Sequence, residues 1–522
     1  MSRMNRAVVV SVLLSAAALS VLGCTTAPLA TTSKAADEAG ASGELRLFFT
    51  SDEHGWLAPV VDKKEAVQRG GVHSFAWKLK DQGFMKGKPG QLLLSSGDMW
   101  TGPYESTVLE GRPMAAAMSQ LGYSAAAVGN HEFDFGLETL IAREKSSAFP
   151  FLGANLLDES SGQLPAWALP YVIVDTGGLR VGIVGLACKE SPTTADPRNM
   201  RGIQFGEYAA ALEKWLPRVA MEGVDEIVVL VHDSVRRVKP LLPILRRHRV
   251  HAVATGHQHV TEVFVDAGGT PDPDDDVMIC NPGPYLRSFC RMDLAFVRGR
   301  LVAGSVRHHD VEVAADADIA PFDEPLAKIV DEAEASANRI GGEVLVQNLN
   351  KLERGPQGAL GQLVVDSWLE ALPFAQVAIT NVGGLRQDLE PGPLRLRDVV
   401  STMPFNNYLL VVDMTGAQLK QALANPQSIA AGVRYTARDE GFRRAISDLV
   451  DTSGKPISDN ARLKVVINDF MYRGGDHYTF AEWDQEPEET AVDWREPVFR
   501  LLRSLGQKNE PLQRTPDDRA GR

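Results

Sequence analysis

The stretch Gly129-Asn130-His131-Glu132-Phe133-Asp134-Phe135-Gly136 is the one around which the fold of this chain is organised. It follows a small apolar run, 125–128, that predicts a buried strand. An amide, an imidazole and two carboxylates therefore come directly after one strand end. In an open α/β sheet, ligands bind in the crevice beyond the carboxyl ends of the strands. The stretch thus predicts one part of a polar site at such an edge.

Four other apolar runs end in the same way, with side chains that are able to bind metals. The run 45–50 is followed by Asp52 and His54, the run 92–95 by Asp98, the run 227–231 by His232, and the run 250–254 by His257 and His259. Short β-rich runs alternate with helical stretches over residues 44–309, which predicts a layered α/β domain. Of the 11 histidines, five lie at these strand ends. By contrast, His248 and His251, in the arginine-rich stretch 246–251, are predicted to lie at a solvated helix end.

The residue types at these strand ends suit a pair of divalent cations. Two ions about 3.5–4 Å apart can clamp an in-line phosphoryl displacement and activate a water molecule. They need one bridging carboxylate, and Asp98 is the best candidate because it follows a glycine and stands alone between donors on other strands. Asp52, His54 and one imidazole of the 257–259 pair can complete one ion, and Asn130, His232 and the other imidazole can complete the second. A donor set without thiolate suits Zn, Mn, Fe or Co and leaves the metal open.

Length and charge limit the class of protein. At 522 residues the chain is too long for a single hydrophobic core, which stops growing at about 250–300 residues, so two domains are expected. Hydrophobic residues make up 44% and charged residues 23%, as in ordinary globular proteins. The net charge of −13 argues against a nucleic-acid partner, because phosphate backbones are bound by clustered Lys and Arg. A small anionic phosphoester needs only local positive charge and stays compatible.

The N-terminus predicts export and membrane attachment. Two arginines precede the apolar stretch 7–22, which has the form of a secretory signal peptide covering residues 1–24. Its last residues, Val21-Leu22-Gly23-Cys24, resemble the bacterial lipobox, in which Cys24 is lipidated; an ordinary signal with an unrelated cysteine is the alternative. Residues 25–42 then form a flexible tether. The sequence predicts a membrane-anchored lipoprotein, in the periplasm or on the cell surface.

The three remaining cysteines do not form a disulfide framework. Cys280 and Cys290 flank a turn-rich segment, so a hairpin disulfide and two buried thiols both stay open. No Cys-x-x-Cys pair is present in the sequence, which argues against a thiolate zinc site.

Four motifs together resemble those of the 5′-nucleotidase family, within the calcineurin-like metallophosphoesterases. They are Phe49-Thr50-Ser51-Asp52-Glu53-His54-Gly55, Ser96-Gly97-Asp98, Gly129-Asn130-His131-Glu132-Phe133-Asp134 and Gly256-His257-Gln258-His259. The resemblance implies a four-layer αββα metallophosphoesterase domain over 43–312 and a smaller α/β substrate-binding domain over 343–505. Between them, 313–342 has the spacing of a linker helix. The polar residues 506–522 predict a disordered tail.

The resemblance also implies individual roles. Asp52, His54, Asp98 and His259 would hold one metal, and Asp98, Asn130, His232 and His257 the other. His131 with Asp134 is similar to the family's catalytic dyad, in which a protonated imidazole stabilises the transition state and the leaving oxygen. In the second domain, Arg386 is implied as the phosphate contact, Phe470 as the ring that stacks on a base and Asp476 as the ligand of the ribose hydroxyls.

One departure from the family pattern affects the substrate. The loop 426–433, where a second base-stacking ring is expected, has no aromatic residue before Tyr435. Hydrolase chemistry is therefore predicted more strongly than nucleotide specificity. The preferred function is a 5′-nucleotidase; the alternatives are a sugar-nucleotide or cyclic-nucleotide phosphodiesterase, a thiosulfate-ester hydrolase, and a non-catalytic binding lipoprotein. The oligomeric state stays open.

Overall fold

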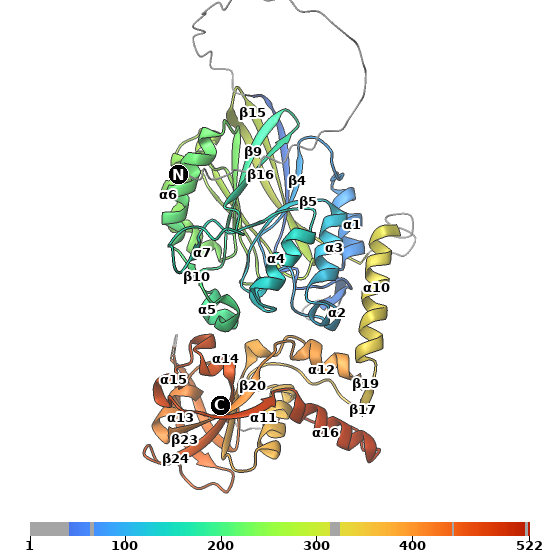
Figure 1. Cartoon of the computed structure of the whole chain (residues 1–522), viewed down its shortest axis with the longest axis vertical. Coiled ribbons are helices and arrows are strands. Elements are labelled where there is room, and N and C mark those ends of the chain that lie inside the picture. Colours follow the sequence, from blue (N-terminus) through green and yellow to red (C-terminus); the bar gives the residue numbers. More distant parts are fainter. Residues whose placement is uncertain (1–40, 63–66, 314–323, 441–442, 517–519, 522) are drawn as a thin grey trace, which may run out of the picture.

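Two six-stranded sheets lie face to face in the first part of the chain (Figure 1). The structure, a computed structural model, describes residues 41–62, 67–313, 324–440, 443–516 and 520–521. The first sheet consists, in spatial order, of β16 (Arg300–Asp310), β15 (Ser288–Val297), β1 (Gly43–Thr50), β4 (Gln91–Ser95), β5 (Tyr123–Ala127) and β6 (Phe151–Leu152). The second consists of β13 (Thr261–Asp266), β14 (Val277–Pro282), β12 (Ala252–Ala254), β11 (Glu226–Val231), β9 (Leu179–Leu186) and β8 (Tyr171–Thr176).

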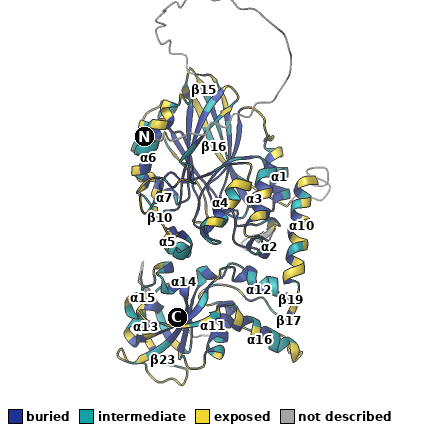
Figure 2. Ribbon diagram, viewed as in Figure 1, coloured by how far each residue is buried: buried dark blue, intermediate teal, exposed yellow. Residues whose placement is uncertain are grey.

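Alternating side chains explain why these sheets stack in layers, because successive residues of a strand point to opposite faces. In β1, Leu47 and Phe49 pack between the two sheets, whereas Phe48 packs with the helices outside. The outer helices of the first sheet are α1 (Val72–Asp81), α3 (Arg112–Leu121) and α4 (Leu137–Ser146), and those of the second are α6 (Tyr208–Met221) and α8 (Leu242–Arg247). The central strands β4, β5, β9, β11 and β12 are buried from both sides, whereas the edge strands β13 and β16 are largely exposed (Figure 2). The predicted four-layer αββα arrangement is confirmed.

Helix α10 (Glu324–Gly341) leads from the first domain to the second (Figure 1). Its apolar face is the one that the sequence spacing predicts, and Leu326, Val330 and Ala333 are buried against the core beneath α1 and α3. The linker helix is therefore anchored on the first domain.

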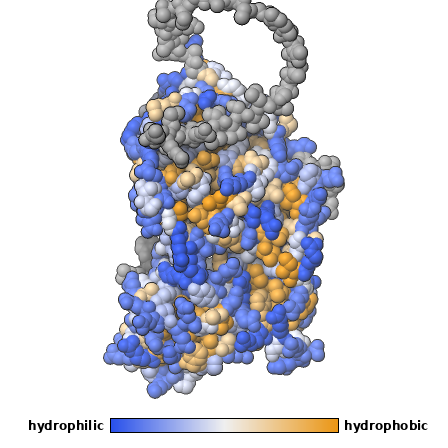
Figure 3. Space-filling model, viewed as in Figure 1, coloured by the Kyte–Doolittle hydropathy of each residue, from blue (hydrophilic) through white to orange (hydrophobic). Residues whose placement is uncertain are grey.

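The second domain is built on a five-stranded mixed sheet. Its strands, in spatial order, are β21 (Ser428–Ala431), β18 (Val377–Asn381), β24 (Arg462–Asn468), β20 (Tyr408–Thr415) and β25 (Glu488–Asp493). Helices α11 (Ala359–Ala371), α12 (Leu396–Thr402) and α16 (Glu496–Gln507) pack against one face, and α13 (Gly416–Leu423) packs against the other. Hydrophilic residues cover most of the molecular face seen in Figure 3, and larger apolar areas interrupt them at mid-height.

The prediction of a disordered tail from residue 506 is wrong for the part that the structure describes. Leu512 is buried in the second domain, and its backbone N–H donates a 2.8 Å hydrogen bond to the carbonyl of Gln347. Arg514 forms an ion pair with Asp366 of α11. A polar composition predicted disorder here because a single apolar residue leaves no periodic signal.

Other expectations have mixed outcomes. Cys188, Cys280 and Cys290 are buried free thiols, so the hairpin disulfide is not formed. His251 is buried rather than solvated, and its Nδ1 lies 2.6 Å from Oε2 of Glu226.

The signal peptide with Cys24 and most of the tether lie outside the described residues. None of the helices in the described ranges is long and apolar enough to cross a membrane.

Candidate active site

The five predicted strand ends meet at one edge of the stacked sheets. Asp52 and His54 follow β1, Asp98 follows β4, Asn130 and His131 follow β5, His232 follows β11, and His257 and His259 follow β12. Three groups of side chains lie close enough together to hold a cation: Asp52, His54 and His259; His54, Asp98 and His131; Asp98, His232 and His257. The sequence-predicted ligands are therefore brought together from distant parts of the chain.

Asp98 occupies the centre of this cluster. Its Oδ2 lies 3.0 Å from Nε2 of His232 and 3.7 Å from Nε2 of His54. The two imidazoles come from different sheets, so the carboxylate lies between donors on both sides. This is the place that a bridging ligand would take.

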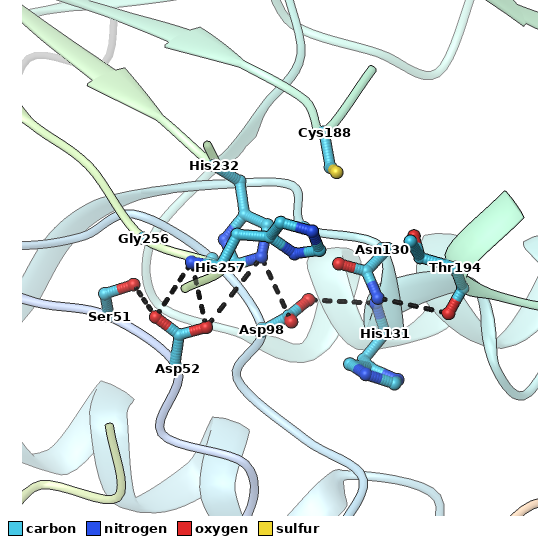
Figure 4. A network of polar contacts seen from close by, with 12 residues as sticks. Ser51, Asp52, Asp98, Asn130, His131, Cys188, Thr194, His232, Gly256 and His257 are labelled. Atoms are coloured by element: carbon cyan, nitrogen blue, oxygen red, sulfur yellow. Dashed lines mark hydrogen bonds and ion pairs between the residues drawn. The ribbon is translucent and has the colours of Figure 1, made fainter. Parts of the chain in front are cut away.

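Asp52 lies against the loop that carries His257 (Figure 4). Its carboxylate accepts a 3.0 Å hydrogen bond from the backbone N–H of His257, and Oδ1 lies 3.4 Å from Nε2 of His259. The Ser51 hydroxyl also contacts the carboxylate. Asp52 thus connects the loop after β1 to the loop after β12.

Two of the imidazoles are fixed from behind by carbonyl groups. Nδ1 of His54 lies 2.9 Å from the carbonyl oxygen of Thr101, and Nδ1 of His232 lies 2.8 Å from that of Ser96. Because a carbonyl can only accept, each Nδ1 carries the hydrogen. Each Nε2 is then the atom available to a metal, as in most metal-binding histidines.

The backbone at the cluster is conformationally unusual. Five predicted ligands, which are Asp52, His54, Asp98, His257 and His259, have φ between 46° and 71°. Such left-handed conformations are uncommon outside glycine and tend to collect at functional sites. Close packing leaves no room for other side chains around them, since a Cβ on Gly129 would lie 2.2 Å from Oδ1 of Asp98.

The charges of the cluster favour cations. Burial opposes a charge on His232, yet Asp98 and Asp52 raise its pKa to about 10. Oδ1 of Asn130 is buried and has no hydrogen-bond partner among the described residues. The donor set consists of two carboxylates, an amide oxygen and imidazole nitrogens, which fits two divalent ions such as Zn or Mn. The residues that would hold them are Asp52, His54, Asp98, Asn130, His232, His257 and His259.

His131 and Asp134 form a close pair beside the cluster. Nδ1 of His131 lies 2.7 Å from Oδ2 of Asp134. Burial lowers the pKa of His131, but Asp134 and Asp98 outweigh it, so the pKa is raised above its usual value. A protonated imidazole held in one orientation is able to stabilise developing negative charge or to protonate a leaving group.

Glu132 organises the backbone around this pair. Its fully buried carboxylate accepts hydrogen bonds from the backbone N–H groups of Asp98 (2.9 Å), Met99 (2.8 Å) and Gly129 (2.6 Å). It thereby joins the loop after β4 to the loop after β5. From the sequence a structural part is expected for Glu132, but only the course of the two loops shows which N–H groups converge on its carboxylate.

A cavity of about 380 Å³ between the two domains lies over the cluster. The residues predicted in the second domain, Arg386, Phe470 and Asp476, line it together with His131 and Asp134. Nη2 of Arg386 lies 3.5 Å from Nε2 of His54. The guanidinium group of a residue in the second domain therefore reaches the candidate metal ligands of the first. Oδ2 of Asp476 accepts a 2.7 Å hydrogen bond from Nδ2 of Asn381.

The cavity has more aromatic lining than the sequence predicted. The loop 426–433 supplies no ring, but Phe405 lines the cavity together with Phe470. The Phe405 ring is also stacked on His131, with ring centroids 5.6 Å apart and an interplanar angle of 18°. Phe405 precedes β20, whereas the expected position follows α13. The sequence Met403-Pro404-Phe405-Asn406 shows that an aromatic residue is present, but no local pattern places its ring over His131.

Comparisons with known proteins agree with this architecture. Residues 45–261 match the model of calcineurin-like phosphoesterases, and residues 339–482 match that of the 5′-nucleotidase C-terminal domain. The chain is 25% identical over 520 residues to a 5′-nucleotidase of Vibrio cholerae, an alignment that covers 90% of this chain and 91% of the relative.

Solved structures show the same fold. The 5′-nucleotidase precursor of Thermus thermophilus has a TM-score of 0.77 and 24% identity, with 91% of this chain and 99% of that chain covered. The sulfate thiohydrolase SoxB of Thermus thermophilus has a TM-score of 0.68 and 17% identity, with 91% and 96% covered. With both domains present in this order, the chain belongs to the 5′-nucleotidase family of metallophosphoesterases.

Proposed function

We propose that this chain is an exported, membrane-anchored hydrolase with two divalent metal ions that releases phosphate from nucleotides. The observation that carries the proposal is the interdomain cavity. It joins the metal cluster and His131 on one side to Arg386, Phe470 and Asp476 on the other. Each of these groups suits one part of a nucleotide.

The phosphate end of the substrate belongs at the metal cluster. When bound, two divalent ions supply Lewis-acid charge to phosphoryl oxygens and lower the pKa of a water molecule. The guanidinium of Arg386 offers a planar fork that matches two phosphate oxygens. His131, held by Asp134, donates a proton to the leaving oxygen or stabilises its charge.

The nucleoside end belongs at the other side of the cavity. The rings of Phe470 and Phe405 offer aromatic faces to a base, and stacking of this kind tolerates any base. The carboxylate of Asp476, which Asn381 already orients, accepts hydrogen bonds from a ribose diol. The aromatic and carboxylate lining on this side of the cavity is what favours this proposal over the thiosulfate-ester and non-catalytic alternatives.

A substrate panel tests the proposal directly. The purified chain is loaded with Mn²⁺ or Zn²⁺ and assayed with nucleoside monophosphates, sugar nucleotides, cyclic nucleotides, a thiosulfate ester and an aryl phosphate. We expect the highest kcat/KM for nucleoside monophosphates. Equal values for nucleotides and aryl phosphate would overturn nucleotide specificity. A chain that binds no metal and hydrolyses nothing would instead support the binding lipoprotein.

Membrane attachment is tested separately at Cys24. We expect the full-length chain to be labelled by a radioactive fatty acid and to be found in the membrane fraction. The Cys24→Ala variant should lose the label and become extractable without detergent, because a lipid chain is the predicted anchor. An unlabelled wild-type chain would show that the segment acts as an ordinary export signal.

A further inference from the structure

Residues 191–200 of the first domain, here called the bridging segment, reach across the interdomain cavity. The segment consists of α5 (Ser191–Thr194) and the 3₁₀ turn Pro197–Met200. Figure 1 shows α5 at the end of the first domain that faces α14 (Asp469–Tyr472) of the second. α5 also packs against the turn Gly475–His477, which carries Asp476.

On its own side the bridging segment holds residues of the catalytic site. Nδ2 of Asn199 donates a 2.8 Å hydrogen bond to the backbone carbonyl of Asp134. Nδ2 of Asn130 lies 3.4 Å from the carbonyl oxygen of Thr194 (Figure 4). The position of the segment is therefore coupled to the partner of His131 and to one predicted metal ligand.

On the other side Arg198 binds the second domain. Its Nη1 donates to the hydroxyl of Tyr408 (2.7 Å), and its Nη2 donates to Oδ2 of Asp469 (2.8 Å). The guanidinium also lies 4.9 Å from the centre of the Tyr408 ring. The Asp469 side chain is completely buried and directly precedes Phe470. Arg198 thus contacts the residue next to the ring predicted to stack on a base.

The guanidinium is held in place for this contact. Nε of Arg198 donates to both carboxylate oxygens of Asp196, at 3.0 and 2.9 Å. Arg473 of the second domain donates to the same Asp469 oxygen (2.6 Å) and to the same Tyr408 hydroxyl (2.9 Å). The positive charges of the two arginines equal the negative charges of the two aspartates. Arg198 and Asp196 belong to the first domain, and Arg473 and Asp469 belong to the second.

Arg386 is positioned independently of this cluster. Its backbone N–H donates to the carbonyl of Thr402 in α12 (2.8 Å). The domains are joined near that helix by a second contact, from the backbone N–H of Tyr104 to Oγ of Ser401 (2.7 Å). Loss of the Arg198 contacts should therefore loosen the nucleoside side of the cavity and leave the phosphate side in place.

We propose that Arg198 is a positioning residue that holds the nucleoside-binding segment Asn468–Asp476 against the catalytic domain, and that Asn199 couples this position to Asp134. The inference rests on the function proposed above. Arg198 touches neither metal nor substrate; it determines where the base and ribose contacts lie relative to His131. Its contribution should therefore appear with substrates that carry a nucleoside and not with a small aryl phosphate.

The test compares Arg198→Ala with Arg198→Lys and Arg473→Ala in the metal-loaded full chain. Arg473→Ala is the matched control, because it removes the same two kinds of hydrogen bond without crossing the domain boundary. KM and kcat are measured for a nucleoside monophosphate and for an aryl phosphate. Small-angle X-ray scattering in the absence of substrate gives the radius of gyration, which increases when the two domains move apart.

We expect Arg198→Ala to raise the nucleotide KM about tenfold to a hundredfold, as for loss of hydrogen bonds to a charged group. The KM for aryl phosphate should change by less than about threefold, within the effect of an ordinary surface substitution. Scattering should show a larger radius of gyration. Arg198→Lys should recover part of the effect, because it keeps the charge and loses the fork, and Arg473→Ala should leave the scattering unchanged.

Three outcomes would overturn the inference: KM values that rise equally for both substrates, an Arg473→Ala variant with the same increase in radius of gyration, or scattering unchanged in Arg198→Ala. A wild-type chain without preference for nucleotides would contradict the proposed function instead. In that case the scattering comparison still decides whether Arg198 holds the domains together.

Discussion

The backbone N–H of His131 donates a 2.9 Å hydrogen bond to Oδ1 of Asp98, while Oδ2 of the same carboxylate lies 3.0 Å from Nε2 of His232. One side chain therefore contacts both the predicted metal ligand His232 and the backbone of His131, the residue proposed to be catalytic. Glu132 strengthens this connection, because its carboxylate binds the backbone N–H groups on both sides. The orientation of His131 and the geometry of the metal cluster are thus mechanically linked.

The His131→Ala variant should lose turnover and keep its metals. Proton transfer by a positioned side chain contributes about 10²–10⁴-fold to a rate, so we expect kcat to fall by that factor. Metal content, measured by elemental mass spectrometry, should equal that of the wild type, since the Asp98 contact uses the backbone of His131. Near-normal turnover, or metal loss in parallel with activity, would contradict the catalytic role.

The Asp98→Asn variant should lose bound metal as well as activity, in contrast to His131→Ala. The amide oxygen can still accept the hydrogen bond from His131, so the local backbone should persist. The charge between His54 and His232 is lost, however, and we expect at least one of two metal equivalents to disappear together with activity. Asp134→Asn is the control, because it removes a nearby carboxylate that is not predicted to bind metal. Full metal occupancy in Asp98→Asn would exclude the bridging role.

The rings of Phe405 and Phe470 should contribute to nucleotide binding. Stacking on an aromatic side chain is worth about 1–3 kcal/mol per base, so Phe470→Ala should raise the nucleotide KM roughly tenfold or more. Phe405→Ala should do the same and also lower kcat, because this ring is stacked on His131. The KM for an aryl phosphate measures the effect of each substitution without a base. If Phe470→Ala left the KM unchanged for both the nucleotide and the aryl phosphate, the predicted base subsite would be wrong.

The buried pair of His251 and Glu226 should make stability depend on pH. Burial lowers the pKa of His251, but Glu226 and the neighbouring Asp274 raise it above its usual value of 6.5. The folded state therefore binds the proton more tightly than the unfolded state. The resulting stabilisation is complete below pH 6.5 and is lost as the pH rises through the raised folded pKa.

This prediction is checked by urea unfolding at about pH 6 and pH 9 with EDTA, which removes the separate pH dependence of metal binding. Breaking a buried ion pair costs about 3–5 kcal/mol, so at the lower pH the His251→Gln variant should be less stable by up to that amount. The difference between wild type and variant should shrink toward the higher pH. A difference that stays constant would show that the pair does not titrate in this range.

The sequence by itself determined the fold of the first domain and the residues of the candidate metal site. Short apolar runs predicted β1, β4, β5, β11 and β12, and polar residues follow each run directly in the chain. Because parallel strands of one sheet present their carboxyl ends at the same edge, local patterns were sufficient to bring Asp52, Asp98 and Asn130 together after β1, β4 and β5. The spacing of Leu326, Val330 and Ala333 likewise predicted α10.

Only the tertiary structure decided which distant residues share the cavity and the cores. It placed Phe405 on His131, joined Arg198 to Asp469, buried His251 beside Glu226 and packed Leu512 into the second domain. The partners in these pairs lie on different elements, and in two of the pairs on different domains. Their contacts depend on how whole layers and domains pack, and the spacing of neighbouring residues carries no information about that packing.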